Sequence, residues 1–582
     1  PSNAIITSAV LTLIPTATSG DNRTIAAHRV TDTWTEGPVT WANTATDFDA
    51  TATSTSFLEW TGSLPASALW TVTTDVQDFV DGVEINYGWL LKDNSEDASQ
   101  SSWFFGSDEN LTSSNRPKLT VVYIVPGVKA NNTTDLDQGG SWLDGSIQLS
   151  NEGVQWESTV TGANTVSLGS NLEFRAIEIV NPGGAVTINA GNTLTLGAGG
   201  IVMGSSTQNL TLNTPLVLNG NQSWTVATSK TITSTGVVSG SNTITKEGAG
   251  SLSLSGTNTF TGGVTHNAGT LNIESVNALG TTAGTLTIAA GTTIDNTSGG
   301  VLVTDNYPIT LNGSFVFTGT DELNLGSGAT LLTSDITITA GAALTFDGVV
   351  SGAHSIYKEG IGNVYLNNEA NTYTGKTTIA QTSSSDGALY YKTIANVGDT
   401  CSLGAPTTIP NGTIAIGSGS YGGNLISVAT SDQSTDRVID LASTTGEVQL
   451  DAGDNANITF TSDLTATGAG SKTLAFRGTT VSNEIEGVIV NNSGSNLTSV
   501  DKRESGTWIL SGDNTYTGTT TITDGTLQIG NGGTTGSLAS TSIVNSGVLN
   551  INRSNELTYS GIILGTGAFV KEGAGTLILD GV

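Results

Sequence analysis

One sequence motif occurs four times along this chain of 582 residues, and it constrains the fold more than any other feature. The copies begin at Lys246 (KEGAGSLSLSGTNTFTGG), Lys358 (KEGIGNVYLNNEANTYTGK), Arg503 (RESGTWILSGDNTYTGT) and Lys571 (KEGAGTLILDGV). A unit this short cannot bury a core of its own, so it must stack on neighbouring units. Recurrence of this kind therefore predicts a solenoid.

Each copy contains a pattern that favours β-strands. Directly after the opening, apolar residues alternate with small polar ones, as at Leu252 and Leu254 in the first copy and at Val364 and Leu366 in the second. A period of two residues is typical of a strand. A turn (SGTN, NEAN or SGDN) and an aromatic-threonine-glycine triplet follow in the first three copies. Each copy therefore predicts about two or three short strands joined by tight bends.

The basic residue and the glutamate that open a copy are adjacent in sequence. Neighbouring residues of a strand point to opposite faces, so these two side chains need not pair with each other. We interpret them as residues that cap a turn or contact a neighbouring coil, and not as a catalytic pair.

The same texture continues between the copies, for example in residues 185–204, 285–300 and 336–352. The chain contains 74 glycines, and glycine supplies the tight bends that a long solenoid needs. We predict that residues 127–582 form one parallel β-helix, for which a right hand is expected. The recurring motif marks certain coils of this β-helix, beginning near residues 246, 358, 503 and 571.

Residues 1–126 differ in composition and contain six of the ten tryptophans. Strand patterns lie near Ala4 (AIITSAVLTLIPT), at Trp89 (WLLKD) and at Lys118 (KLTVVYIVP). The segment DVQDFVDG has apolar residues at helical spacing, with Asp75 as the expected N-cap. These patterns predict an all-β, jelly-roll-like β-sandwich with one short helix, ending at residue 126.

The formal net charge of −31 arises from 19 basic and 50 acidic residues. Such a surface repels phosphate backbones and anionic lipid, so nucleic acid and bare membranes are poor partners. No run of about 18 apolar residues occurs, which argues against a membrane-inserted segment. The single cysteine, Cys401, excludes a disulfide framework and a thiolate metal cluster, and we expect no cofactor.

Two family resemblances rest on these residues. SAVLTLIPT, HRVTDTWTEGPVTWAN, TTDVQDFVDGVEINYGWLLKD, FFGSDEN and RPKLTVVY, in this order, resemble the disaggregatase-related (DNRLRE) family of jelly-roll-like domains of secreted and surface proteins. The motif copies resemble the autotransporter-associated β-strand repeat, or passenger-associated transport repeat, of bacterial passenger domains. Both resemblances imply an extracellular bacterial setting, and neither implies a conserved catalytic centre.

Both ends of the chain depart from these patterns. The DNRLRE family usually has one or two strands ahead of the SAVLTL strand, and the fourth motif copy stops before its NTYTG turn. An open β-helix end exposes unpaired main-chain groups, which can template another strand. We therefore expect either a longer parent chain or head-to-tail self-assembly through strand edges at Ala4, Ile5, Ile6, Leu577, Ile578 and Leu579.

Some parallel β-helices cleave polysaccharides, so the fold class alone leaves an enzyme open. That chemistry needs clustered carboxylates, often with calcium, and a basic residue beside them. The candidates are scattered along the sequence: Asp295, Asp305, Asp321, Glu322, His28, His266 and His354. They form no recognisable catalytic or metal-binding motif, so we predict no catalytic residue, no metal site and no enzyme activity.

Trp34 and Trp41 flank TEGPVT, a loop-like segment in which an aromatic ring can be exposed. Exposed indole rings on a β-sandwich can stack on sugar rings, whereas buried ones fill the core. Both interpretations are open for these two residues, and the first predicts a polysaccharide-binding surface.

Together these patterns predict an extracellular structural protein of the bacterial cell surface, whose β-helix is a subunit or segment of a fibre built by end-to-end strand contacts. An autotransporter-type adhesin passenger that binds glycans or host or biofilm surfaces is the alternative. A polysaccharide-degrading β-helix enzyme is a second alternative.

Overall fold

The computed structural model describes residues 4–34, 47–81, 83–94, 102–124, 126–148, 150, 152–383, 387–480 and 482–581. The chain divides into two compact units. The first, called here the N-terminal unit, consists of Pro1–Ala130 and Trp142–Gln155. The second, called the solenoid unit, consists of Asn131–Ser141 and Trp156–Val582.

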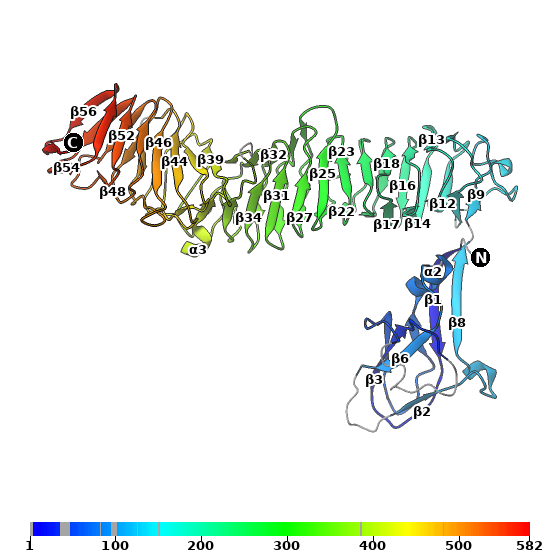
Figure 1. Ribbon diagram of the computed structural model, residues 1–582. Coiled ribbons are helices and arrows are strands. Elements are labelled where there is room, and N and C mark those ends of the chain that lie inside the picture. The colour runs from blue at the N-terminus through cyan, green and yellow to red at the C-terminus, as the bar shows by residue number, and fades with distance from the viewer. Residues whose placement is uncertain are drawn as a thin grey trace. The chain divides into compact units, whose positions relative to one another are not determined.

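The N-terminal unit is built from antiparallel β-sheets (Figure 1). One three-stranded sheet has the order β5 (Ala68–Thr71), β1 (Ile5–Leu13) and β8 (Lys118–Ile124). A second has the order β4 (Ser54–Leu58), β3 (Arg23–Arg29) and β6 (Trp89–Asp93). A smaller sheet pairs β2 (Pro15–Thr18) with β7 (Trp103–Phe105).

Alternation along these strands places apolar side chains of both three-stranded sheets in one core. Ala9 of β1, Ala27 of β3 and Trp70 of β5 are fully buried members of it. The indole Nε1 of Trp70 donates a hydrogen bond to the Ile25 carbonyl oxygen at 2.8 Å, so its polar atom is satisfied in the apolar interior. The arrangement confirms the predicted β-sandwich.

The predicted helix is present as α2 (Thr73–Asp81), which contacts β1. It begins three residues earlier than an N-cap at Asp75 predicts, so Asp75 lies in its first turn instead of capping it. The reason is that Asp75 is buried and its carboxylate binds other side chains instead of capping the helix. Its carboxylate accepts hydrogen bonds from Trp89 Nε1 at 2.5 Å and from Thr53 Oγ1 at 2.8 Å.

The solenoid unit is a parallel β-solenoid of about 19 turns, as predicted (Figure 1). One sheet runs through its N-terminal half, from β12 (Leu172–Ile179) to β33 (Val350–Ser351). A second sheet runs from β11 (Asn164–Val166) to β41 (Ile439–Leu441). Two further sheets continue the unit, one from β26 (Leu302–Val303) to β55 (Ile562–Gly565) and one from β40 (Gln433–Thr435) to β56 (Ala568–Glu572).

Strands of successive turns pair in parallel and keep the same faces inward. In the second sheet this is seen across β13 (Val186–Ile188), β15 (Leu210–Leu212) and β18 (Thr231–Ser234). Val186, Leu210 and Ile232 are register partners and are fully buried. Each is followed by a threonine that is only half-buried. The period-two pattern of the sequence thus corresponds to alternating inward and outward side chains.

Helices are few in the described part of the chain. Besides α2, the described residues contain one other short α-helix, α3 (Ile409–Gly412), which lies between β37 (Leu389–Tyr391) and β38 (Ile414–Ile416). No helix within the described ranges is long and apolar enough to cross a bilayer.

Candidate functional site

The lysine that opens the first motif copy is a structural residue. Lys246 lies in β20 (Ile244–Glu247) and is fully buried. Its Nζ donates hydrogen bonds at 3.0, 2.7 and 2.8 Å to the carbonyl oxygens of Glu247, Gly248 and Ala268. Burial lowers the pKa of this ammonium group to about 8. The Glu247 carboxylate instead accepts a hydrogen bond from Asn267 Nδ2 at 2.6 Å. The adjacent Lys246 and Glu247 side chains therefore bind different partners and do not pair with each other.

The same arrangement recurs in later copies. Lys358 is fully buried, and its Nζ donates to the Gly360 carbonyl oxygen at 2.5 Å. In the third copy the buried residue is Lys502 and not Arg503, which corrects the predicted start of this copy by one residue. Lys502 Nζ donates at 2.6, 2.6 and 3.2 Å to the carbonyl oxygens of Arg503, Glu504 and Asp524. Lys502 therefore donates hydrogen bonds to carbonyl groups of two successive turns.

Glu504 of the third copy stands where the other copies have the glycine of the Lys-Glu-Gly opening. It occupies the left-handed backbone position of Gly248, with φ of 60° against 75° for the glycine. At Gly248 an added Cβ would lie 2.3 Å from the Val226 carbonyl oxygen, so glycine is required there. At Glu504 the side chain gains partners of its own, because its carboxylate accepts from Gly478 N at 2.8 Å and from Arg477 Nη1 at 3.3 Å.

A buried asparagine precedes each aromatic-threonine-glycine triplet, at Asn258, Asn371 and Asn514. Asn371 accepts a hydrogen bond from Val350 N at 2.7 Å through Oδ1 and donates from Nδ2 to the Ser402 carbonyl oxygen at 2.8 Å. One amide thus bridges the preceding and the following turn, which keeps its buried polar atoms satisfied.

The aromatic residue of the triplet has a matched partner four residues later. Tyr373 shares a hydrogen bond of 2.8 Å with the Thr377 hydroxyl, and Tyr516 shares one of 2.7 Å with the Thr520 hydroxyl. All four side chains are fully buried. In the first copy the corresponding residues are Phe260 and Val264, so both hydroxyls are absent together. The recognisable side chains of the motif therefore serve the stacking of turns.

The carboxylates considered for catalysis hold separate structural positions. Asp295 accepts from Thr320, Asp305 from Asn277, and Asp321 from Gly299. Glu322 contributes its carbonyl oxygen to Asn296 Nδ2 at 2.6 Å. Among the described residues, no group of three or more His, Cys, Asp and Glu side chains is arranged to hold a metal ion.

The three histidines are likewise apart. His28 Nδ1 lies 2.8 Å from the Asp49 carbonyl oxygen, and His354 Nδ1 lies 3.7 Å from an Asp335 carboxylate oxygen. His266 is fully buried in β22 (Val264–His266), where its Nε2 lies 2.8 Å from the Thr293 carbonyl oxygen. Burial lowers the pKa of His266 to about 4.

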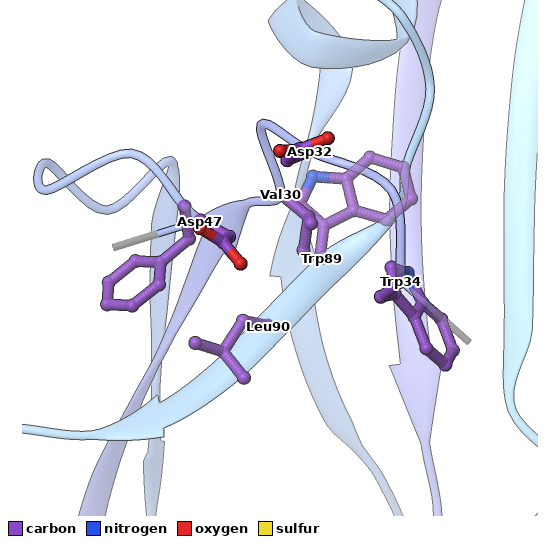
Figure 2. A pocket seen from close by; sticks show the side chains of 7 residues that line it. Val30, Asp32, Trp34, Asp47, Trp89 and Leu90 are labelled. Atoms are coloured by element: carbon purple, nitrogen blue, oxygen red, sulfur yellow. The ribbon is translucent and has the colours of Figure 1, made fainter. Parts of the chain in front are cut away.

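A cavity of about 170 Å³ lies in the N-terminal unit, beyond the end of β3. It is lined by Val30, Asp32, Trp34, Asp47, Phe48, Trp89 and Leu90, and is called here the aromatic pocket. Antiparallel pairing assembles it, because β6 brings Trp89 and Leu90 opposite the end of β3 and an isolated bridge joins Val30 to Phe48. Figure 2 shows Trp34 and Trp89 on one side of Val30 and Asp47 on the other.

Trp34, predicted as a sugar-stacking residue, lines this pocket with 54% of its surface exposed. Its Nε1 donates to the Tyr87 carbonyl oxygen at 2.8 Å. Trp89 packs against Phe79 at a centroid distance of 5.7 Å, and its Nε1 is held by Asp75. Both indoles are therefore fixed by their N–H groups. The other predicted stacking residue, Trp41, lies outside the described residues.

The sequence predictions did not include Asp32, Asp47, Phe48 and Trp89 in this site. Asp32 and Trp34 are two residues apart in sequence, and Asp47 directly precedes an aromatic residue. This pairing of carboxylates with aromatic rings is a usable sequence signal. It does not reveal that β6 and the Val30–Phe48 bridge bring the segments together.

The predicted assembly edges are placed as follows. Ile5 and Ile6 pair with Ile124 and Tyr123 of β8, and Ile6 N donates to Gln77 Oε1 of α2 at 2.6 Å. The Ala4 carbonyl oxygen accepts from Gln77 Nε2 at 3.2 Å. Leu577, Ile578 and Leu579 form β57 (Leu577–Leu579), which pairs in parallel with β54 (Leu557–Tyr559). End-to-end assembly through these residues stays a prediction.

Comparison with known families identifies the motif. The family model of the passenger-associated-transport-repeat matches residues 244–273, 356–381 and 500–529. These ranges contain the buried Lys246, Lys358 and Lys502. The chain therefore carries three copies of this autotransporter repeat within its solenoid.

The chain is also similar to the adhesin BmaC autotransporter of Brucella suis biovar 1 (strain 1330), with 30% identity over 460 residues. The similar region covers 73% of this chain and 13% of that adhesin, so the chain spans a small part of its relative. No solved structure matches the chain significantly.

Proposed function

We propose that this chain is a segment of the passenger of an autotransporter-type adhesin, carried outside a bacterial cell, and that it acts by binding and not by catalysis. The observation that carries the proposal is the similarity over 460 residues to an adhesin autotransporter. The three transport repeats support it. The sequence left three functions open: a fibre subunit, an adhesin passenger and a polysaccharide-degrading enzyme. These comparisons favour the adhesin passenger.

In this proposal the two units have different roles. The solenoid unit is a scaffold, since its motif side chains are buried and bonded to its own main chain. The N-terminal unit, which resembles DNRLRE domains of surface proteins, is the part that binds a polysaccharide. The aromatic pocket is the binding site, because an exposed and fixed indole can stack on a sugar ring.

The test is adhesion of the full chain to immobilised carbohydrate. Fluorescent beads coupled to the protein are applied to arrays of plant, algal, bacterial and host glycans, and we expect retention on a subset of them. Trp34→Ala should abolish that retention. Trp60→Ala is the matched control, because Trp60 is also exposed in the N-terminal unit but does not line the pocket. Absence of retention on every glycan, or equal retention of Trp34→Ala, would overturn the proposal.

A further inference from the structure

We propose that the solenoid unit carries a docking edge for an extended, basic peptide segment of another protein, which adds a strand in front of β26. The edge consists of residues 301–304 and is called here the β26 edge. Such a docking site goes beyond glycan binding by the N-terminal unit and does not depend on it. Three features support it: an open strand edge, the apolar side chains along that edge and the charges around it.

β26 is the first strand of its sheet, so a strand pairs with it on one side only. That partner is β29 (Leu323–Asn324), which runs parallel to it. The N–H groups of Leu302 and Thr304 donate to carbonyl oxygens of the β29 turn at 3.1 and 2.9 Å. Alternate residues of a parallel strand direct their main-chain groups to opposite edges, so those of Val301 and Val303 point away from β29. Within the described part of the chain, these groups have no hydrogen-bond partner.

The preceding turn meets this turn beyond the β26 edge. Asp305, which follows the edge, donates its N–H to the Val276 carbonyl oxygen at 3.1 Å. Directly before the edge, a Cβ added to Gly299 or Gly300 would meet no atom within 4 Å. The start of the edge therefore has room for another chain.

A second sheet that begins within the solenoid, at β40, has its first strand covered. Gln433 Oε1 accepts from Ile394 N at 2.9 Å, and Gln433 Nε2 donates to the Lys392 carbonyl oxygen at 2.8 Å. The Thr435 hydroxyl donates to the Ala395 carbonyl oxygen at 2.7 Å. The chain thus protects β40 with its own preceding segment. An edge without such protection is a template for pairing with another chain.

Apolar side chains follow the β26 edge. Val301 and Val303 are 69% and 51% exposed, whereas Leu302 between them is buried. Val276 of the preceding turn is 49% exposed. A strand added here lies about 4.8 Å from β26, so its outward side chains would remove these valines from water. Main-chain pairing supplies the affinity of such an addition, and alternate side chains supply its specificity. The edge therefore favours a peptide with apolar residues at alternate positions.

The charges around the edge favour a basic peptide. Residues 247–357 contain eight acidic residues and no Lys or Arg. Glu322 is exposed and directly precedes β29, in the row of Val301. The Asp321 carboxylate accepts from a main-chain N–H of the turn before β26 at 3.1 Å, and Asp305 directly follows the edge. Lysine or arginine side chains at the ends of the added strand would complement these carboxylates, while an acidic peptide would be repelled.

The experiment is fluorescence anisotropy of labelled peptides with the full chain at low salt. The basic peptide is Lys-Lys-Val-Thr-Val-Lys-Lys. A second peptide has Glu in place of every Lys, and a third is the basic peptide with N-methyl groups on its three central residues. We expect the basic peptide to bind at least about tenfold more tightly than either of the others, and to bind more weakly as salt rises.

Two substitutions test the edge from the side of the protein. Val303→Pro removes an outward N–H at an edge position, where proline is tolerated, and should abolish binding of the basic peptide. Glu322→Gln removes one neighbouring charge and should weaken that binding several-fold at low salt. The matched control is Glu556→Gln, which removes an exposed carboxylate far from β26 in sequence and should leave binding unchanged.

Equal binding of the basic and the N-methylated peptide, which have the same charge, would overturn strand addition. Unchanged binding by folded Val303→Pro would overturn the assignment to this edge. Equal binding of the acidic peptide would overturn the basic partner, and absence of binding by every peptide would overturn the whole proposal. Circular dichroism shows whether Val303→Pro is folded. If it is not, the N-methylated peptide decides, because that comparison leaves the protein unaltered.

Discussion

The motif-bearing turns of the solenoid unit and the aromatic pocket of the N-terminal unit both gather polar and aromatic side chains, but they use them in opposite ways. In the turns, Lys246 and Tyr373 are fully buried and bonded within the chain. In the pocket, Trp34 is 54% exposed, and its N–H is bonded away from the cavity. The recurring side chains are buried and stabilise the fold, whereas the exposed ring of Trp34 suits the proposed binding role.

Removal of a motif lysine is expected to have the largest effect on stability. Lys502→Ala leaves three carbonyl oxygens between two turns without their donor, so we expect a loss of about 3 kcal/mol in the local free energy of opening. Hydrogen–deuterium exchange around residues 502–524 measures it. The control is Lys376→Ala, which removes a half-buried lysine and should cost less than about 0.5 kcal/mol. Equal effects of the two substitutions would contradict a structural role for the motif lysine.

Acidification should destabilise the first motif copy by a similar amount. The pKa of His266 is lowered to about 4 in the folded chain, against about 6.5 in an unfolded one. The unfolded state therefore binds more protons between these values, so stability is complete above pH 6.5 and falls as the pH drops to 4, by about 3 kcal/mol. Lys246, the register partner of His266, adds repulsion to the protonated ring.

Amide exchange of residues 264–296 at pH 7, 5.5 and 4 checks this prediction. His266→Gln cannot be protonated in this range, so it should remove most of the local pH dependence. A pH dependence that persists unchanged in this variant would show that other groups are responsible.

A smaller loss of stability is expected when the tyrosine-threonine pair is disrupted. Tyr373→Phe leaves the buried Thr377 hydroxyl without its partner and should cost about 1 kcal/mol. The double variant Tyr373→Phe/Thr377→Val recreates the Phe260 and Val264 combination of the first copy, so we expect it to recover most of that loss. Chemical denaturation of the single and double variants measures the coupling. Additive losses would show that the hydroxyls are not a matched pair.

Much of the solenoid could be predicted from sequence because strand alternation and the motif are local features. Leu252 and Leu254 are buried where the period-two pattern places them. The start of the third copy could not be fixed, because Lys502 and Arg503 are both basic and only the backbone shows which one turns inward. Of the residues that line the aromatic pocket, only Trp34 could be predicted from the sequence. Its other members come from separate segments that long-range pairing brings together.

The assignment of a scaffold role to the solenoid unit and a binding role to the aromatic pocket can be tested in one experiment. Trp34→Ala and Lys502→Ala are compared in the same two assays, glycan binding and the free energy of unfolding. We expect Trp34→Ala to lose binding with little change in stability, because its ring is largely exposed. We expect Lys502→Ala to lose stability and keep binding at temperatures where it is folded. The reverse pattern, with binding lost in folded Lys502→Ala and retained in Trp34→Ala, would contradict the assignment of scaffold and binding roles to the two regions.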